Sequence, residues 1–285
     1  MGVVARLLSA FLALAFVFGV GAALFALARP NYRPSSGPIW DVLATPIASE
    51  AAGDLAAKAG VTAVQLIFAA ALNSAFLAVL AGGLALVVGI PLGFWLSVHA
   101  PLPLAGSLRA LLSATAGFPA YFVVFVLQVG AVELSRTAGR PLIPTFGFGL
   151  DAHLVIPVLA LALAPCGYVA RLVAIGAADC NGRDFIRTAR AKGLTELRVV
   201  YTHILPNMVG AVGEAVFGGL RLVLAGLVIV EYLVSWPGLG YLVLRAIRSQ
   251  DAVVFIGAIG SLGIVFLLLE RALDLMTERT GAVTG

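Results

Sequence analysis

The stretch "RTARAKGLTELRVVYTHILPN", residues 187–207, is strongly charged, although the chain around it is mostly apolar. Of the 285 residues, 61% are hydrophobic and 11% are charged, against roughly 45–50% and about 25% in soluble domains. Six cationic residues gather in and just before this stretch: Arg171, Arg183, Arg187, Arg190, Lys192 and Arg198. We expect an integral membrane protein in which this basic segment lies outside the bilayer.

Charge-free runs on both sides of the basic segment are long enough to cross a bilayer, which takes about 20 apolar residues. They predict an all-α polytopic membrane protein with a single domain, residues 1–285, and about six transmembrane helices. The expected spans are residues 7–28, 74–97, 110–132, 152–171, 205–230 and 252–270. The first is expected to be a retained anchor, because its 22 uncharged residues exceed the apolar core of about 7–15 residues in a signal peptide.

Residues 59–98 carry no charge over 40 positions, which is too long for one crossing without extreme tilt. We expect the first part, which carries Gln65 and Asn73, to form an interfacial helix that leads into the span at 74–97.

The distribution of Lys and Arg predicts sidedness, because cytoplasmic loops are enriched in these residues. The basic cluster places the loop at about 176–203 in the cytoplasm. With six spans, both termini are then expected to be cytoplasmic too.

Helical periodicity predicts the local structure of this loop. Arg183, Arg187 and Arg190 share one face of a helix, and Phe185, Ile186 and Ala189 share another. Gly193 is expected to end this helix in a left-handed conformation, and Thr195 to cap a second helix that has Glu196 in its first turn. A basic amphipathic helix on its own usually lies on anionic lipid, but a rigid helix–glycine–helix elbow joined to two spans is suited to transmit force from a partner protein.

The same segment resembles the cytoplasmic signature loop, the EAA loop, of permease subunits of binding-protein-dependent ABC importers. "RTARAKGL" (187–194) is followed by "HILPN" (203–207), with the Leu-Pro pair twelve and thirteen residues after the glycine. The likeness extends over about residues 63–280 and includes "LVVGIPLG" (86–93), "GFPAYF" (117–122) and "VEYLVSWPGLG" (230–240). These motifs are similar to those of the dipeptide, oligopeptide and nickel branch of the family. Importers of this branch carry two permeases, and the chain is closer to the first, since the "GTDxxGRD" signature of the second is absent.

The resemblance implies a bacterial inner-membrane permease that works with a second homologous permease, two cytoplasmic ATPases and an extracytoplasmic solute-binding protein. ATP and Mg²⁺ would bind to the ATPases, since this chain lacks the GxxxxGK[ST] phosphate loop. Short peptides are the expected cargo, with nickel or another small solute as alternatives. The residues implied to couple transport to the ATPase are Arg183, Asp184, Phe185, Arg187, Thr188, Ala189, Arg190, Ala191, Lys192, Gly193, Leu205 and Pro206.

Two ionisable residues, Glu214 and Arg221, fall inside an expected span, about 10.5 Å apart along one helix face. A charge at mid-bilayer costs at least about 2.5 kcal/mol unless it is paired or hydrated, so both should face the bundle interior. They are expected either to line the substrate path or to pair with each other or with the partner permease. Phe118 and Tyr121, beside Pro119, are expected either to flank the pore or to pack in the core.

Other classes of protein fit the residues less well. Cys166 and Cys180 lack a paired spacing, and the three histidines, His99, His153 and His203, lack metal-ligand spacing or a nucleophile beside them. We therefore expect no catalytic residue, no metal site and no cofactor in this chain. The positive charge is attributed to membrane sidedness, not to a nucleic-acid partner. A secondary carrier would show inverted repeats with broken helices, and no convincing repeat is present.

Overall fold

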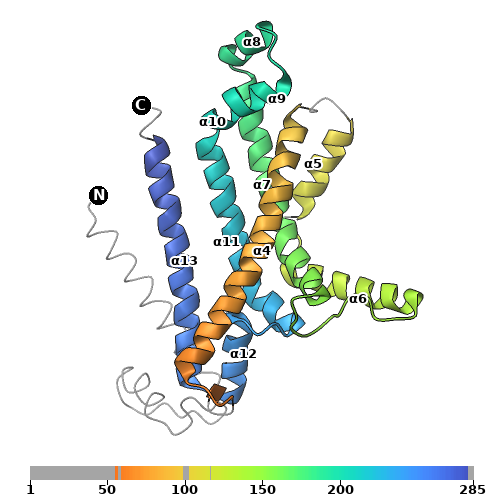
Figure 1. The fold of residues 1–285 in the computed structure, drawn as a ribbon, viewed down its shortest axis with the longest axis vertical. Helices are drawn as coiled ribbons and strands as arrows, with labels where there is room; N and C mark the ends of the chain where they lie inside the picture. The colour runs from red at the N-terminus through yellow and green to blue at the C-terminus, as the bar shows by residue number, and fades with distance from the viewer. Residues whose placement is uncertain (1–54, 57–58, 99–102, 116, 282–285) are drawn as a thin grey trace. The chain divides into compact units, whose positions relative to one another are not determined.

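The computed structural model describes residues 55–56, 59–98, 103–115 and 117–281 (Figure 1), and every regular element in this part of the chain is helical. The α-helices are α4 (Ala63–Val98), α5 (Pro103–Thr115), α6 (Ala120–Ala138), α7 (Val155–Asn181), α8 (Asp184–Ala191), α9 (Glu196–Val199), α10 (Leu205–Asn207), α11 (Val209–Val234), α12 (Leu239–Ser249) and α13 (Ala252–Gly281). A 3₁₀ turn, η1 (Ala152–Leu154), precedes α7, and a π-helical turn, η2 (Val200–Ile204), precedes α10.

Four helical segments of the described residues are long and apolar enough to cross a membrane: residues 63–97, 120–138, 152–181 and 209–234. The apolar part of α13, Ala252–Leu268, is shorter. The expected span at 7–28 lies outside the described residues. The fold is thus all-α and polytopic, as the composition indicates.

The structure joins the expected interfacial segment and the expected span at 74–97 in one helix, α4, of 36 residues. At about 1.5 Å per residue it is about 54 Å long, well beyond the thickness of a bilayer core. Gln65 lies in the first turn of this helix. Its side-chain oxygen accepts from the backbone N–H of Thr62 at 3.0 Å, and its own N–H donates to the Thr62 hydroxyl at 3.3 Å. This reciprocal pair is a capping box.

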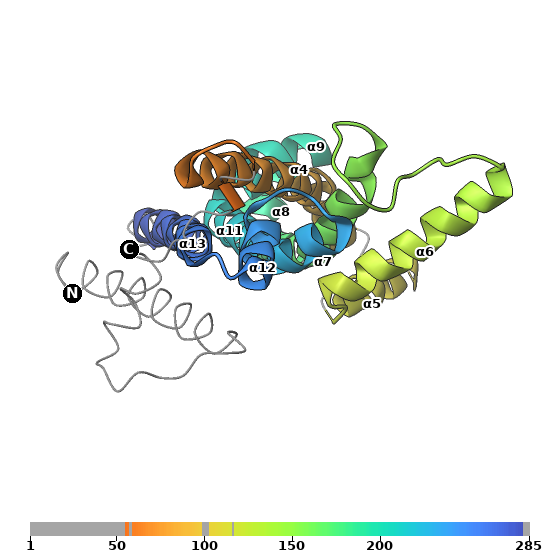
Figure 2. The same cartoon turned by 90° about the horizontal axis from the view of Figure 1, so that it is seen from below.

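The expected span at 110–132 is also wrong, since two helices divide this segment. The first, α5, ends at Thr115, and α6 begins only after Pro119, whose ψ of 142° is extended. Proline disfavours a helical conformation in the residue before it and cannot donate to the preceding turn. Hydropathy averaged over the segment does not register this break. Both helices pack against α7, and most of α6 projects outward with exposed residues (Figure 2).

The remaining expected spans lie on helices with different ends. The expected 152–171 span continues in α7 to Asn181, well past Arg171. The expected 205–230 span begins with the short α10 and continues in α11 to Val234. The expected 252–270 span lies in α13, which ends at Gly281.

The described chain divides into two compact units. The smaller contains residues 55–56, 59–76, 146–148 and 231–268. Its core surrounds Phe255, which is 1% exposed, together with buried residues of α12 and α13. Asp251 caps α13, because its carboxylate accepts from the N–H of Val254 at 3.1 Å and also from the N–H of Leu55 at 3.0 Å.

The larger unit contains residues 77–98, 103–115, 117–145, 149–230 and 269–281. Its core includes Val169 and Val173 of α7, Ile186 of α8 and Met208, all at most 2% exposed. Helices α4 and α7 approach closely at Gly93. A Cβ atom at this position would lie 2.6 Å from the carbonyl oxygen of Ala170 and 2.7 Å from the Cβ of Val173. Small residues allow such backbone approach between membrane helices.

Replacing Gly93 with valine should destabilise the protein by about 1–3 kcal/mol, because the added methyl groups must force α4 away from α7. The matched control is Gly83→Val in the same helix, where an added Cβ would meet no atom within 4 Å. Thermal unfolding of the purified variants in a neutral detergent measures the difference. Equal shifts for both variants would show that the helix contact at Gly93 tolerates a side chain.

Candidate functional site

The basic segment folds into an elbow, defined here as residues 183–208, which comprises α8, the corner at Gly193, α9, η2, α10 and the following Met208. The first helix is amphipathic, as its periodicity predicts. Ile186 is fully buried and Ala189 is 4% exposed, and both join the core of the larger unit. Phe185 was expected on the same face but is 39% exposed. Consecutive residues point about 100° apart around a helix, so burial of Ile186 turns Phe185 toward the surface.

The cationic side chains of the elbow differ in their positions and contacts. Arg183 stands at the N-cap of α8, with an extended ψ of 146°, and Lys192 stands at the C-cap. The side chain of Arg187 is 74% exposed, with Asp184 at 3.6 Å. Arg190 differs, because its guanidinium is directed at the second arm of the elbow.

Gly193 forms the corner with a φ of +78°. Its N–H donates to the carbonyl of Arg190 at 2.9 Å, and the N–H of Leu194 donates to the carbonyl of Ala189 at 3.4 Å. These two bonds form a Schellman motif, the usual helix end with a left-handed glycine. No atom lies within 4 Å of a Cβ placed at Gly193. Backbone conformation alone, not lack of space, therefore requires glycine here.

Arg190 ties the two arms of the elbow together. Its Nε and Nη2 donate to the two carboxylate oxygens of Glu196 at 2.7 and 3.0 Å. Nη2 also donates to Oδ1 of Asn181 at the end of α7, at 3.0 Å, and the Asn181 amide donates to Oγ of Ser97 in α4, at 3.2 Å. One guanidinium thus connects the elbow to two long helices. The sequence pattern did not reveal this connection, because it placed Arg190 on a common cationic face.

The hydrogen bond from Arg190 lowers the pKa of Glu196 below its usual value and raises the pKa of Arg190. A lowered carboxyl pKa means that the tie is fully present above the unfolded-state value of about 4.3 and is lost as the pH falls through the folded-state pKa. The two side chains are 37% and 55% exposed, so solvent screening limits the ion pair itself to less than about 1 kcal/mol. The hydrogen bonds of Arg190 therefore serve mainly to hold the two arms of the elbow in a fixed orientation, and they add little to the free energy of unfolding.

The second arm runs from α9 into the long helix α11. Val199, Ile204 and Met208 are at most 2% exposed and fix this arm on the core of the larger unit. The π-helical turn η2 precedes Pro206, which lies in the first turn of α10. Proline lacks an N–H and its ring crowds the carbonyl four residues earlier, so a locally widened helix is the expected response. Leu205 and Pro206 therefore mark the point where the elbow joins the membrane helix.

Replacing Arg190 with glutamine should loosen the elbow without unfolding the protein. Glutamine cannot bind a carboxylate with two parallel N–H groups, and the ion pair is partly exposed. We expect amide hydrogen exchange in residues 184–200 to accelerate several-fold while the unfolding temperature changes little. Arg187→Gln is the matched control, because Arg187 is more exposed and its ion pair is longer. Equal exchange in the two variants would contradict the role of Arg190 as a tie.

The four residues expected along a translocation path lie in two different parts of the chain. Phe118, in the bend before α6, and Tyr121, in the first turn of α6, are 45% and 56% exposed, and Phe118 stacks on Phe122 with ring centroids 5.6 Å apart. On α11, Glu214 is exposed and Arg221 is half-buried.

The start of α6 meets α11 at Gly226, where an added Cβ would lie 3.2 Å from the Cβ of Ala120. Gly226 is twelve residues, or about 18 Å along the helix, from Glu214. Phe118 and Tyr121 are thus near a different part of α11 from the carboxylate of Glu214.

A second polar site, in the smaller unit, was missed by sequence reasoning. Glu231 is fully buried near the end of α11. One carboxylate oxygen accepts from the Ser74 hydroxyl at 2.6 Å, and the other accepts from the N–H groups of Gly240 and Tyr241 at 2.7 and 3.4 Å. The Ser74 oxygen also accepts from the N–H of Leu239 at 2.7 Å. Glu231 and Ser74 together therefore satisfy the first N–H groups of α12.

The turn between Glu231 and α12 is fixed by further contacts of the same cluster. The indole of Trp236, which is fully buried, donates to the carbonyl of Asn73 at 3.2 Å, and the Asn73 amide donates to the carbonyl of Pro237 at 2.9 Å. A Cβ atom at Gly238 would collide with the carboxylate of Glu231. The available sequence signal was an acidic residue at the end of an apolar helix, followed by a Trp-Pro-Gly turn.

The sequence of this chain matches a known protein family. The family described as "Binding-protein-dependent transport system inner membrane component" matches residues 89–280. The dipeptide transport system permease protein DppB of Escherichia coli K12 is 33% identical over 125 residues, which are 44% of this chain and 37% of the relative. A putative peptide permease protein of Brucella suis is 29% identical over 208 residues, 70% of this chain and 65% of the relative. The glutathione transport system permease protein GsiC of Escherichia coli K12 is 31% identical over 160 residues, 56% of this chain and 50% of the relative.

The matched part of this chain thus spans about a third to two thirds of the length of these relatives. Among solved structures, an inward-facing form of the MetNI methionine ABC transporter has a TM-score of 0.60 at 20% identity. That match covers 75% of this chain and 96% of the other chain. At this level of identity the likeness shows the fold.

Proposed function

Because the chain belongs to the family of inner-membrane components of binding-protein-dependent transport systems, we propose that it is the permease subunit of an ATP-driven importer. In this proposal the elbow is the lever on which a separate ATPase acts. The observation that carries the proposal is the elbow itself. It presents an exposed Phe185 and Arg187 on a short helix whose opposite face is fixed on the membrane helices by Ile186. Movement imposed on α8 is therefore passed to α7 and α11 instead of being absorbed by a flexible loop.

The partners follow from this division of labour. Two cytoplasmic ATPases would bind ATP and Mg²⁺, and their closure would move this chain against a second, homologous permease. A solute-binding protein would deliver the cargo from the outer side. The elbow then faces the cytoplasm, as its cationic residues favour, and both termini lie on the same side.

The proposed cargo is a short peptide. The relatives named for dipeptides, peptides and glutathione support this choice. The RTARAKGL motif of the elbow is also similar to the motif of the dipeptide, oligopeptide and nickel branch of the family. The chain corresponds best to the first permease of the pair.

The exposed carboxylate of Glu214 also requires a partner or water, because an isolated charge that faces lipid costs at least about 2.5 kcal/mol. We place Glu214 and Arg221 at the surface where the second permease and the solute path meet α11.

Reconstitution of the full transporter into vesicles tests the proposal. A radiolabelled tripeptide, supplied with the binding protein, should accumulate only when ATP is present on the ATPase side, and a non-hydrolysable ATP analogue should abolish uptake. Uptake driven by an ion gradient without ATP would contradict the importer and favour a secondary carrier. ATP-dependent uptake of nickel without peptide uptake would contradict the cargo and leave the mechanism intact.

A further inference from the structure

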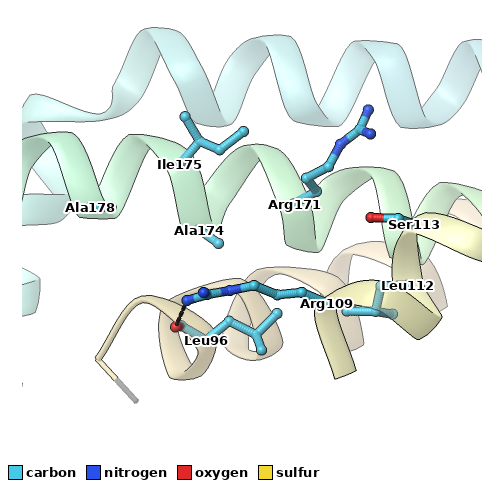
Figure 3. Close-up of a pocket in the computed structure, with 8 residues that line it drawn as sticks. All are labelled: Leu96, Arg109, Leu112, Ser113, Arg171, Ala174, Ile175 and Ala178. Carbon is cyan, nitrogen blue, oxygen red and sulfur yellow. Dashed lines mark hydrogen bonds between the residues drawn. The ribbon is translucent and has the colours of Figure 1, made fainter. Parts of the chain in front are cut away.

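A cavity of about 440 Å³ lies between α4, α5 and α7, within the larger unit (Figure 3). This volume is within the roughly 300–1,000 Å³ of small-molecule sites. Its walls include Leu96 of α4, Arg109 and Leu112 of α5, and Arg171, Ala174 and Ile175 of α7. Two arginines therefore share a cavity that is otherwise mostly apolar.

Arg109 is held in place from one side. Its Nη2 donates to the carbonyl of Leu96, in the last turn of α4, at 2.7 Å, and so satisfies one of the free carbonyls at that helix end. A guanidinium carries five N–H donors. The bond to Leu96 uses one of them, and the others remain available to a ligand in the cavity.

Arg171 extends from the α7 wall, and its guanidinium points away from that of Arg109 (Figure 3). It makes no hydrogen bond or ion pair with the residues that the structure describes, and Arg109 makes no ion pair with them. Both arginines are exposed. An anion in the cavity would be attracted by both positive charges, and the Arg171 side chain is free to turn toward it.

The apolar walls of the cavity favour an anion that carries hydrocarbon chains over a small inorganic anion. Leu96, Leu112 and Ile175 offer hydrocarbon surface, and Ile175 is 53% exposed on a helix long enough to cross the membrane. A free phosphate ion gains nothing from such surface, whereas acyl chains do. The cavity also lies near the end of α4 and on the part of α7 that leads to the basic elbow. The cationic residues of the elbow favour the cytoplasmic side of the membrane for this end of the helices. Basic pockets between membrane helices on this side suit anionic lipid headgroups.

We propose that this cavity binds an anionic glycerophospholipid, with its phosphate between Arg109 and Arg171 and the first part of its acyl chains against Leu112 and Ile175. Binding would hold α5 against α7 next to the elbow. This site depends on the chain being a membrane protein with the elbow on the cytoplasmic side, and it is independent of the proposed transport function and its cargo.

Native mass spectrometry of the purified full-length chain in a neutral detergent tests the site. Phosphatidylglycerol should bind at least tenfold more tightly than phosphatidylcholine. The double variant Arg109→Gln and Arg171→Gln should lose about 25-fold in affinity for phosphatidylglycerol, about fivefold for each arginine removed near a lipid surface. The control Arg136→Gln and Arg140→Gln removes the same charge outside the cavity and should retain wild-type affinity.

Two further measurements keep the site testable if the double variant does not fold. A photoactivatable phosphatidylglycerol should crosslink the wild-type chain within residues 103–115 or 171–178. Inorganic phosphate added without lipid should not raise the unfolding temperature, whereas phosphatidylglycerol should. Equal binding of the two lipids, equal losses in the two double variants, crosslinks confined to other segments, or stabilisation by phosphate alone would each overturn the proposal.

Discussion

Replacing Gly193 with valine should reduce ATP-driven uptake by about 5- to 30-fold while the amount of inserted protein stays unchanged. The φ of +78° at this corner costs a residue with a Cβ atom about 1–2 kcal/mol, and a β-branched side chain is among the least tolerated there. That strain lowers the equilibrium ratio of intact to disrupted elbow by a comparable factor. The substituted side chain has open space around it, so the effect comes from the backbone. Uptake per inserted molecule and ATP hydrolysis by the assembled transporter are measured together.

Two controls separate the elbow from general damage. Gly193→Asn should retain most uptake, because asparagine tolerates the left-handed conformation. Gly139→Val introduces the same strain at a φ of +66°, also in open space, but at the end of α6, and it should leave uptake close to wild type. A Gly193→Val variant with normal uptake, or a Gly139→Val variant with the same defect, would contradict a special role for the corner.

Replacing Glu231 with alanine should destabilise the protein by about 3–5 kcal/mol. The change leaves the Ser74 hydroxyl and two N–H groups of α12 without their acceptor in a buried site, and each unsatisfied buried donor costs about 1–3 kcal/mol. It also opens a cavity beside Trp236 and Gly238. We expect a large drop in the unfolding temperature of the purified chain in detergent.

Glu231→Gln keeps one acceptor oxygen in place and should lose about half as much stability. Glu133→Ala is the matched surface control, because its carboxylate is 62% exposed and lies 3.5 Å from Arg136, and such pairs contribute less than about 1 kcal/mol. If Glu231→Ala unfolds at the same temperature as Glu133→Ala, the buried carboxylate does not support α12.

Local signals in the sequence were sufficient to predict the elbow. Ile186 and Ala189 repeat at helical spacing, Gly193 follows the last turn, and Glu196 opens the next helix. Each of these features depends on residues only a few positions apart, so periodicity and capping rules apply directly. The inward turn of Arg190 was not predictable in this way, because its partners Glu196 and Asn181 lie on different elements.

The ends of the long helices were less predictable, for two physical reasons. Hydropathy counts apolar residues but does not register where a helix breaks, so the interruption before Pro119 was averaged into one span. The helix start at residue 63 was not predicted, although Thr62 and Gln65 carry the spacing of a capping box. The Glu231 cluster was missed because Ser74 lies 157 residues away in the chain. No local pattern connects residues so far apart.

The most direct test of the lever is site-specific crosslinking between the elbow and the ATPase. In a variant with Cys166 and Cys180 replaced by serine, a cysteine at the exposed position Phe185 should form a disulfide with cysteines placed along a surface groove of the ATPase subunit, and ATP should change its yield. A cysteine at the exposed position Phe125 of α6 is the control and should give no such product. If the Phe185 cysteine never crosslinks to the ATPase, or reacts with an impermeant reagent from the outer side of intact cells, the elbow is not the lever proposed here.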